Sequence, residues 1–242
     1  MQPGLSRGKG ANECLIRAVR KGTDMVFPIG DDNRARRGVP IITYLLILAN
    51  VAVFLLELNR GNAFIQKWAF IPAEFRDDPA GEIQTVFTAM FMHGGWLHLF
   101  GNMLYLWIFG DNVEDNFGSL RFLLFYIICG VFATFAQMAV MPESSIPNLG
   151  ASGAIAGVLG AYVVLHPRGR VRVIVGRGGI AEVPAIVAIG LWIVIQLVSG
   201  IGAITTTTQT ADVGGVAYMA HIGGFFAGVV MVFLFRRSRY RT

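Results

Sequence analysis

Three short segments place serine, histidine and asparagine side chains inside apolar stretches of the sequence. The first contains His93, His98 and Asn102, the second contains Ser152 between glycines, and the third contains His221. A serine hydroxyl and an imidazole are the minimum for an activated nucleophile, because the imidazole can take the hydroxyl proton and return it to a leaving amine. These residues therefore indicate nucleophilic catalysis, provided that the fold brings the three segments together.

Ser152 lies at the start of an expected helix. The segment before it, Met141–Asn148, contains two prolines and predicts a helix start near Leu149 or Gly150, which puts Ser152 in the first turn. There the unpaired backbone N–H groups and the positive end of the helix dipole can stabilise a developing negative charge. A helix that ends near Leu165 covers only ~20–25 Å of a ~30 Å hydrocarbon core, so Ser152 lies roughly 10 Å below the outer surface. The alternative is a small-residue helix interface without chemistry.

His221 is the base that could serve this hydroxyl. Gly224 and Gly228 share its helix face, and glycines also follow Ser152, so two glycine-faced helices could pack closely enough for a hydrogen bond. The alternative is a histidine that only bonds to a neighbouring helix. His166 is a poor candidate for the base, because it sits about 14 residues and ~21 Å along the same helix from Ser152.

The histidine-rich segment can supply hydrogen-bond donors. His98 and Asn102 are four residues apart, which places them on one helical face where both side chains can meet one oxyanion. His93 precedes a Gly-Gly pair, so we expect it in a loop or a distorted turn. A metal site is the main alternative for several histidines. The spacing of His93 and His98 places them apart around a helix, and no carboxylate lies within the adjacent turns, so we expect neither a metal nor another cofactor.

The composition indicates that helices in lipid position these groups. The chain has 242 residues, of which 54% are hydrophobic and 14% are charged, and its mean hydropathy is +0.58. A soluble chain carries about 25% charged residues, so a soluble enzyme, a disordered chain and a disulfide scaffold are excluded. We predict an all-α polytopic membrane protein with six spans, near Val39–Leu58, Thr88–Gly110, Leu120–Met141, Leu149–Leu165, Val183–Ile201 and Val216–Phe235. Gln137 and Gln196 are interpreted as interhelical hydrogen-bonding residues without chemistry.

The basic residues predict the orientation of these spans. With six spans, 17 of the 20 Lys and Arg residues fall on the side of both termini and three fall on the other side. The positive-inside rule then places both termini in the cytosol. Because orientation and contact with anionic lipid explain the net charge of +5, we expect no nucleic-acid partner. The expected domains are a basic cytosolic tail at 1–38, a six-helix domain at 39–236 and a second basic tail at 237–242.

The three segments together resemble the rhomboid intramembrane serine proteases. The matching motifs are HxxxxHxxxN at His93, His98 and Asn102, GxSG at Gly150–Gly153 and AHxxG at Ala220–Gly224, on the second, fourth and sixth spans. The resemblance covers roughly Val39–Arg236. It implies a six-transmembrane-helix, rhomboid-like bundle in which a short central helix carries the nucleophile.

The resemblance also implies roles for single residues in peptide-bond hydrolysis by a Ser–His dyad with no acidic third member. Ser152 would be the nucleophile and His221 the general base. His98, Asn102 and the backbone N–H of Ser152 would form the oxyanion hole, and Gly150 would allow the substrate to approach closely. His93, Gly157 and Gly224 would be structural residues near the site.

Two positions depart from the pattern of the family. Some members carry an aromatic residue four positions after the nucleophile, which stacks on the catalytic histidine. This chain has Ala156 there, so His221 must be oriented otherwise. Some bacterial members have a Trp-Arg pair before the second span, where this chain has Gln84 and Thr85.

The expected substrates are single-pass transmembrane proteins, cleaved near the outer membrane face. Because an intact helix hides its peptide bonds in hydrogen bonds, they should contain helix-destabilising residues, with a small residue before the scissile bond as the family suggests. Membrane lipids are the other expected partners, and the expected location is the bacterial inner (plasma) membrane. The alternative functions are a catalytically silent relative that binds membrane clients and a small transporter. A transporter would need ionisable residues along a pathway or inverted repeats, and the sequence indicates neither.

Overall fold

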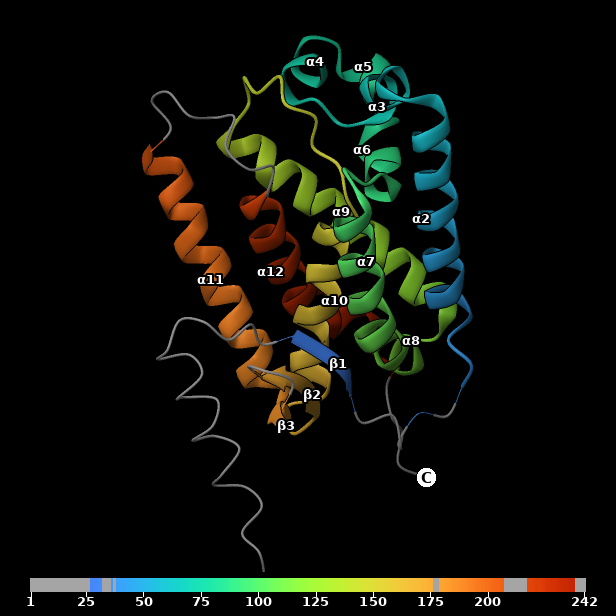
Figure 1. Cartoon of the computed structure of the whole chain (residues 1–242), viewed down its shortest axis with the longest axis vertical. Helices are drawn as coiled ribbons and strands as arrows, with labels where there is room; N and C mark the ends of the chain where they lie inside the picture. The colour runs from blue at the N-terminus through green and yellow to red at the C-terminus, as the bar shows by residue number, and fades with distance from the viewer. Residues whose placement is uncertain (1–26, 32–35, 37, 176–178, 207–216, 238–242) are drawn as a thin grey trace, which may run out of the picture.

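The chain folds into a helical bundle, seen in a computed structural model that describes residues 27–31, 36, 38–175, 179–206 and 217–237. Figure 1 shows helix α10 in the middle of the bundle, with α11 at one edge and α2 at the other. Short helices gather at one end of the bundle and a small β-sheet lies at the opposite end. Most of the expected tail at 1–38, and residues 238–242, lie outside the described residues.

Four of the described helices are long and apolar enough to cross a membrane. They are α2 (Ile41–Arg60), α9 (Ser119–Val140), α11 (Ala185–Thr206) and α12 (Tyr218–Phe235). The central helix α10 (Ser152–Leu165) has only 14 residues, about 21 Å, and is enclosed by its neighbours along most of its length. The predicted polytopic membrane fold with a short central helix is therefore confirmed.

The second expected span, Thr88–Gly110, is not one continuous helix. The chain forms α6 (Thr85–Thr88), a 3-10 turn η1 (Ala89–Phe91), α7 (Trp96–Tyr105), a π-helical turn η2 (Leu106–Gly110) and α8 (Asp111–Phe117). The break before α7 coincides with Gly94 and Gly95, and glycine in a helix interior costs roughly 1 kcal/mol relative to alanine. His93 lies in this break, as the sequence predicts.

The first long loop folds into short helices at one end of the bundle. They are α3 (Asn62–Trp68), α4 (Pro72–Asp77) and α5 (Pro79–Glu82). Phe70 is completely buried and its ring lies 5.2 Å from that of Phe75. Arg76 bonds to Glu143, in the loop before α10, and to Asp77, and these hydrogen bonds raise the pKa of Arg76 above its ordinary value. The loop is thus attached to the segment that leads into the central helix.

An antiparallel sheet at the other end was not predicted, so the all-α description is incomplete. Its strands β1 (Phe27–Asp31), β2 (Arg170–Val175) and β3 (Gly179–Pro184) pair in that order. In β2 the arginines alternate with Val171 and Val173, which are completely buried. This period of two is typical of a strand with one buried face.

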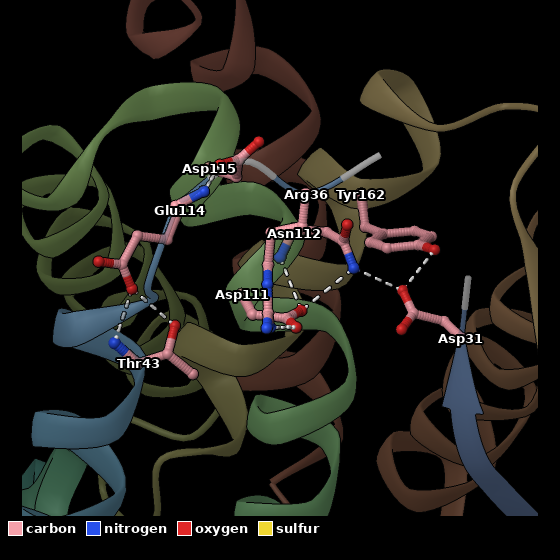
Figure 2. Close-up of polar contacts among 9 residues, drawn as sticks. Asp31, Arg36, Thr43, Asp111, Asn112, Glu114, Asp115 and Tyr162 are labelled. Atoms are coloured by element: carbon pink, nitrogen blue, oxygen red, sulfur yellow. Dashed lines mark hydrogen bonds and ion pairs between the residues drawn. The ribbon is translucent and has the colours of Figure 1, made fainter. Parts of the chain in front are cut away.

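Helix α8 connects the elements at the end of the bundle where the sheet lies (Figure 2). Arg36 forms a salt bridge with Asp111 at 2.6 Å. Asn112 Nδ2 and the Tyr162 hydroxyl both donate hydrogen bonds to Asp31 Oδ2, at 2.7 and 2.9 Å. The central helix, α8 and strand β1 therefore share one buried carboxylate.

Glu114 joins α8 to the start of α2. Its carboxylate accepts hydrogen bonds from the backbone N–H groups of Ile42 and Thr43, from the Thr43 hydroxyl and from the Ser119 hydroxyl, at 2.6–3.0 Å. The two N–H groups belong to the first turn of α2, which has no side-chain cap of its own. A buried carboxylate from a distant helix thus satisfies donors that would otherwise be unpaired.

We expect Glu114→Ala to lower the free energy of unfolding by about 2 kcal/mol or more, because several charge-assisted hydrogen bonds are lost together. Thermal unfolding in detergent measures this as a drop of several degrees in Tm. The matched control is Glu74→Ala on α4, where the carboxylate is exposed. Equal Tm values for the two variants would contradict the role given to Glu114.

Candidate active site

The segment before Ser152 is fixed by backbone hydrogen bonds to the first long loop and to η1. Phe70 and Asn148 exchange two backbone hydrogen bonds, of 3.1 and 2.7 Å, and the Gly150 N–H donates to the Ala89 carbonyl at 2.9 Å. Helix α10 then begins at Ser152. Its first backbone N–H groups have no intrahelical partner, as expected for a helix start.

Gly150 requires the conformation and the space that only glycine has. Its φ is +132°, a region that other L-residues rarely adopt. A Cβ atom here would lie 2.8–2.9 Å from the imidazole of His98 and 3.6 Å from Ser152 Oγ. The structure therefore brings His98 and Gly150 together beside the hydroxyl of Ser152.

Glycines bring the backbones of α10 and α12 into direct contact. A methyl group on Gly224 would collide with the carbonyl of Gly153, and one on Gly228 would collide with the carbonyl of Gly157. Gly157 also faces Cys129 on α9, so α10 is enclosed from two sides. The sequence predicted this small-residue packing, and the close approach determines which side chains of the two helices can meet.

The hydroxyl of Ser152 and the imidazole of His221 form a hydrogen bond. Ser152 Oγ lies 2.8 Å from His221 Nε2. Ser152 is the first residue of α10 and His221 the fourth of α12, so both side chains lie near helix ends. This is the geometry that an activated serine nucleophile requires.

The other ring nitrogen of His221 is also engaged. Nδ1 lies 2.7 Å from Oε1 of Gln196 on α11. The ring of Trp192, one turn earlier on the same helix, lies 5.7 Å from the imidazole ring. Gln196 is an interhelical hydrogen-bonding residue, as predicted, but its partner is the histidine next to Ser152.

The remaining predicted residues lie on α7 and in the break before it. Asn102 is buried, and its Nδ2 has no hydrogen-bond partner among the described residues. His93 is buried with its ring 5.1 Å from that of His98, and its backbone N–H donates to the carboxylate of Glu57 on α2. Glu57 itself was missed, although an acidic residue in an apolar span is a visible signal.

A small cavity of about 20 Å³ lies beside Ser152. Its walls include Met90, Gly130, Ala133 and Thr134 from outside α10. That volume accepts a water molecule or a very small side chain. Among the described residues, no three His, Cys, Asp or Glu side chains come together in a way that could hold a metal ion.

Comparisons with known proteins all point to one family. The family model of the rhomboid domain matches residues 80–238. The chain is 35% identical over 200 residues to rhomboid protease GluP of Bacillus subtilis, which covers 81% of this chain and 36% of that protein. It is 29% identical over 198 residues to the mitochondrial rhomboid protein 1 of Saccharomyces cerevisiae, covering 78% of this chain and 51% of the relative.

A chloroplast protein is also similar. The chain is 28% identical over 151 residues to rhomboid-like protein 11 of Arabidopsis thaliana, which covers 61% of this chain and 50% of that protein. The matches to these three relatives span between about a third and about half of the relatives' own lengths. The similarity therefore concerns the part of each relative that aligns with the helical bundle.

We expect Gly228→Ala to force α10 and α12 apart and to lower Tm by several degrees, because its methyl group collides with backbone. Labelling of Ser152 by a fluorophosphonate probe should fall about 10- to 100-fold as His221 moves away. The control is Gly190→Ala on α11, where a Cβ atom meets nothing within 4 Å. If both variants behave alike, glycine packing does not set the geometry of the site.

Proposed function

We propose that this chain, which belongs to the rhomboid family, is an intramembrane serine endopeptidase. The observation that carries the proposal is the 2.8 Å hydrogen bond between Ser152 Oγ and His221 Nε2. In this proposal Ser152 is the nucleophile and His221 is the general base. Because both side chains lie within a membrane-spanning bundle, the proposed substrate is a peptide bond that lies within or beside the membrane.

In the proposed reaction, His221 Nε2 carries a proton from Ser152 Oγ to the nitrogen of the leaving amine. As Ser152 Oγ attacks the carbonyl carbon, its proton passes to His221 Nε2. The C–N bond then breaks and the imidazolium returns the proton to the leaving amine, which leaves an acyl group on Ser152. A water molecule gives a proton to Nε2 as its oxygen attacks the acyl carbon. The bond between the acyl carbon and Ser152 Oγ then breaks, and the imidazolium returns its proton to Oγ, which releases the acid and regenerates the hydroxyl.

The oxyanion of each tetrahedral intermediate needs donors. We assign this role to the backbone N–H of Ser152 and to the side chains of His98 and Asn102. Two observations support the assignment: the unpartnered Nδ2 of buried Asn102, and the position of His98 against Gly150 next to Ser152. The start of α10 adds the positive end of its dipole.

The substrates that suit this site are single-pass transmembrane proteins whose helix unwinds near the outer face. Helix α10 is too short to cross a ~30 Å core, so Ser152 lies within the membrane but near one side. A peptide bond can reach it only after its helix has opened, which favours helix-destabilising residues. The cavity beside Ser152 supports a small residue before the scissile bond.

The orientation that fits this site places both termini in the cytosol. The sheet and α8 then face the cytosol, and the short helices α3–α6 face outward, which agrees with 17 of 20 basic residues on the cytosolic side. We propose a multi-pass protein of the bacterial inner membrane, with the protease domain at 39–236 between basic tails at 1–38 and 237–242.

Cleavage of a helix-destabilised transmembrane substrate in proteoliposomes tests the proposal. Ser152→Ala and His221→Ala should each lower the rate of cleavage by at least about 10³-fold. Ser145→Ala is the matched control, because this serine is exposed in the loop before α10. If purified folded protein cuts no faster than Ser152→Ala, the protease proposal fails and a silent client-binding relative becomes the better description.

We expect Met90→Ala to broaden the choice of residue before the scissile bond. Met90 lines the cavity, and its side chain also fills the space beside Gly130. The ratio of kcat/KM for a substrate with Leu to one with Ala at this position should rise about tenfold, because a few methylene groups decide such preferences. Met103→Ala, whose side chain does not line the cavity, should leave the ratio unchanged.

A further inference from the structure

We infer that Gln196 is a positioning residue for His221, so that hydrogen bonds connect three residues in a row, Gln196, His221 and Ser152. This inference deepens the proposed protease function and rests on it. The amide oxygen of Gln196 accepts a hydrogen bond from His221 Nδ1–H and so fixes the imidazole in the tautomer that can take a proton from Ser152. The third residue is a neutral amide and comes from α11, a helix that carries neither member of the pair.

The two distances define this chain of hydrogen bonds. Gln196 Oε1 lies 2.7 Å from His221 Nδ1, and Ser152 Oγ lies 2.8 Å from His221 Nε2. An amide oxygen can only accept, so Nδ1 must carry the hydrogen of the neutral imidazole. Nε2 is then left with its lone pair, which is what a general base needs. The opposite tautomer would place the proton on Nε2 and prevent transfer from the hydroxyl.

The same face of α11 also holds the plane of the imidazole ring. Trp192 and Gln196 are four residues apart, and Trp192 places its ring 5.7 Å from that of His221 at an interplanar angle of 37°. Helix α10 supplies no aromatic ring here, because position 156 is a completely buried alanine. One helix thus provides both the hydrogen-bond acceptor and the flat surface that orient the base.

Burial makes the hydrogen bond from His221 to Gln196 specific. Only 8% of Gln196 is exposed, so water cannot readily replace His221 as the partner of its amide oxygen. When His221 becomes an imidazolium, Nδ1–H continues to donate to the amide oxygen. A neutral acceptor stabilises this cation less than a carboxylate does. Gln196→Glu should therefore stabilise the imidazolium, and Gln196→Leu should destabilise it.

The test compares Gln196→Leu, Gln196→Asn and Gln196→Glu with wild type, using the transmembrane substrate in proteoliposomes. Gln196→Leu removes the acceptor at similar size and should lower kcat about 10- to 100-fold while KM changes less than about twofold. Gln196→Asn keeps an amide but shortens its reach, so its kcat should lie between those of Gln196→Leu and wild type. The matched control is Gln137→Leu, which removes a half-buried glutamine on α9 whose amide oxygen accepts a hydrogen bond from the Ala220 N–H of α12 at 3.3 Å and does not contact the imidazole.

Gln196→Glu should change the pH dependence of kcat/KM, which would stay the same if Gln196 had only a structural role. A carboxylate beside Nδ1–H favours the imidazolium, so the acidic limb of the kcat/KM profile should shift to higher pH by about one unit or more. His98 on α7 also acts electrostatically on His221, and it is the same in both proteins. This measurement remains informative if Gln196→Leu fails to fold.

The outcomes separate the two proposals. Wild-type kcat in folded Gln196→Leu, or an unshifted profile in active Gln196→Glu, overturns the positioning role while inactive Ser152→Ala leaves the protease function intact. If Gln137→Leu loses as much kcat as Gln196→Leu, the effect is general packing and the inference also fails. Activity of Ser152→Ala equal to wild type instead overturns the proposed function itself.

Discussion

The contact between the backbones of α10 and α12 is the constraint on which the rest of the structure depends. A 2.8 Å bond between side chains as short as serine and histidine requires helix axes closer than ordinary side chains permit. Glycines at 153, 157, 224 and 228 remove those side chains from the interface. Each glycine weakens its own helix, but packing and the lack of competing water in lipid offset that cost.

The two ends of the bundle keep this central contact in place. At one end, α8 satisfies the start of α2 through Glu114 and reaches the central helix through Asp31 and Tyr162. At the other end, the segment before Ser152 is bonded to Phe70 and Ala89. The α10 helix is therefore stable although it is short, because its neighbours fix both of its ends.

The membrane fold and the family could be predicted from the sequence because both depend on local sequence patterns. Apolar runs identify spans, and polar residues such as Ser152 and His221 stand out against them. Their catalytic roles stay predictions, although the structure brings the two side chains together. The break before α7 was predicted only at His93, which is followed by Gly94 and Gly95.

What the sequence did not predict depends on contacts between distant segments. The sheet joins strands about 140 residues apart, and the six residues of β2, in which Arg alternates with Val only at the start, do not indicate which segment pairs with them. Gln196 was predicted to form an interhelical hydrogen bond, but the sequence around it does not indicate that its partner is His221, 25 positions away. Glu57 was not predicted, because the partner of its carboxylate is the backbone N–H of His93, 36 positions away, and no local pattern indicates that contact.

The short central helix has a consequence for the choice of lipid. Tyr162, near the end of α10, is bonded to Asp31 of the β-sheet, so the depth of Ser152 is fixed relative to the end of the bundle where the sheet lies, at about 1.5 Å for each helical residue. The four long helices, in contrast, match the bilayer and tilt or adapt when it thickens. Added acyl-chain length thus accumulates on the Ser152 side of the bundle, and hydrophobic mismatch changes how far Ser152 lies below that membrane surface.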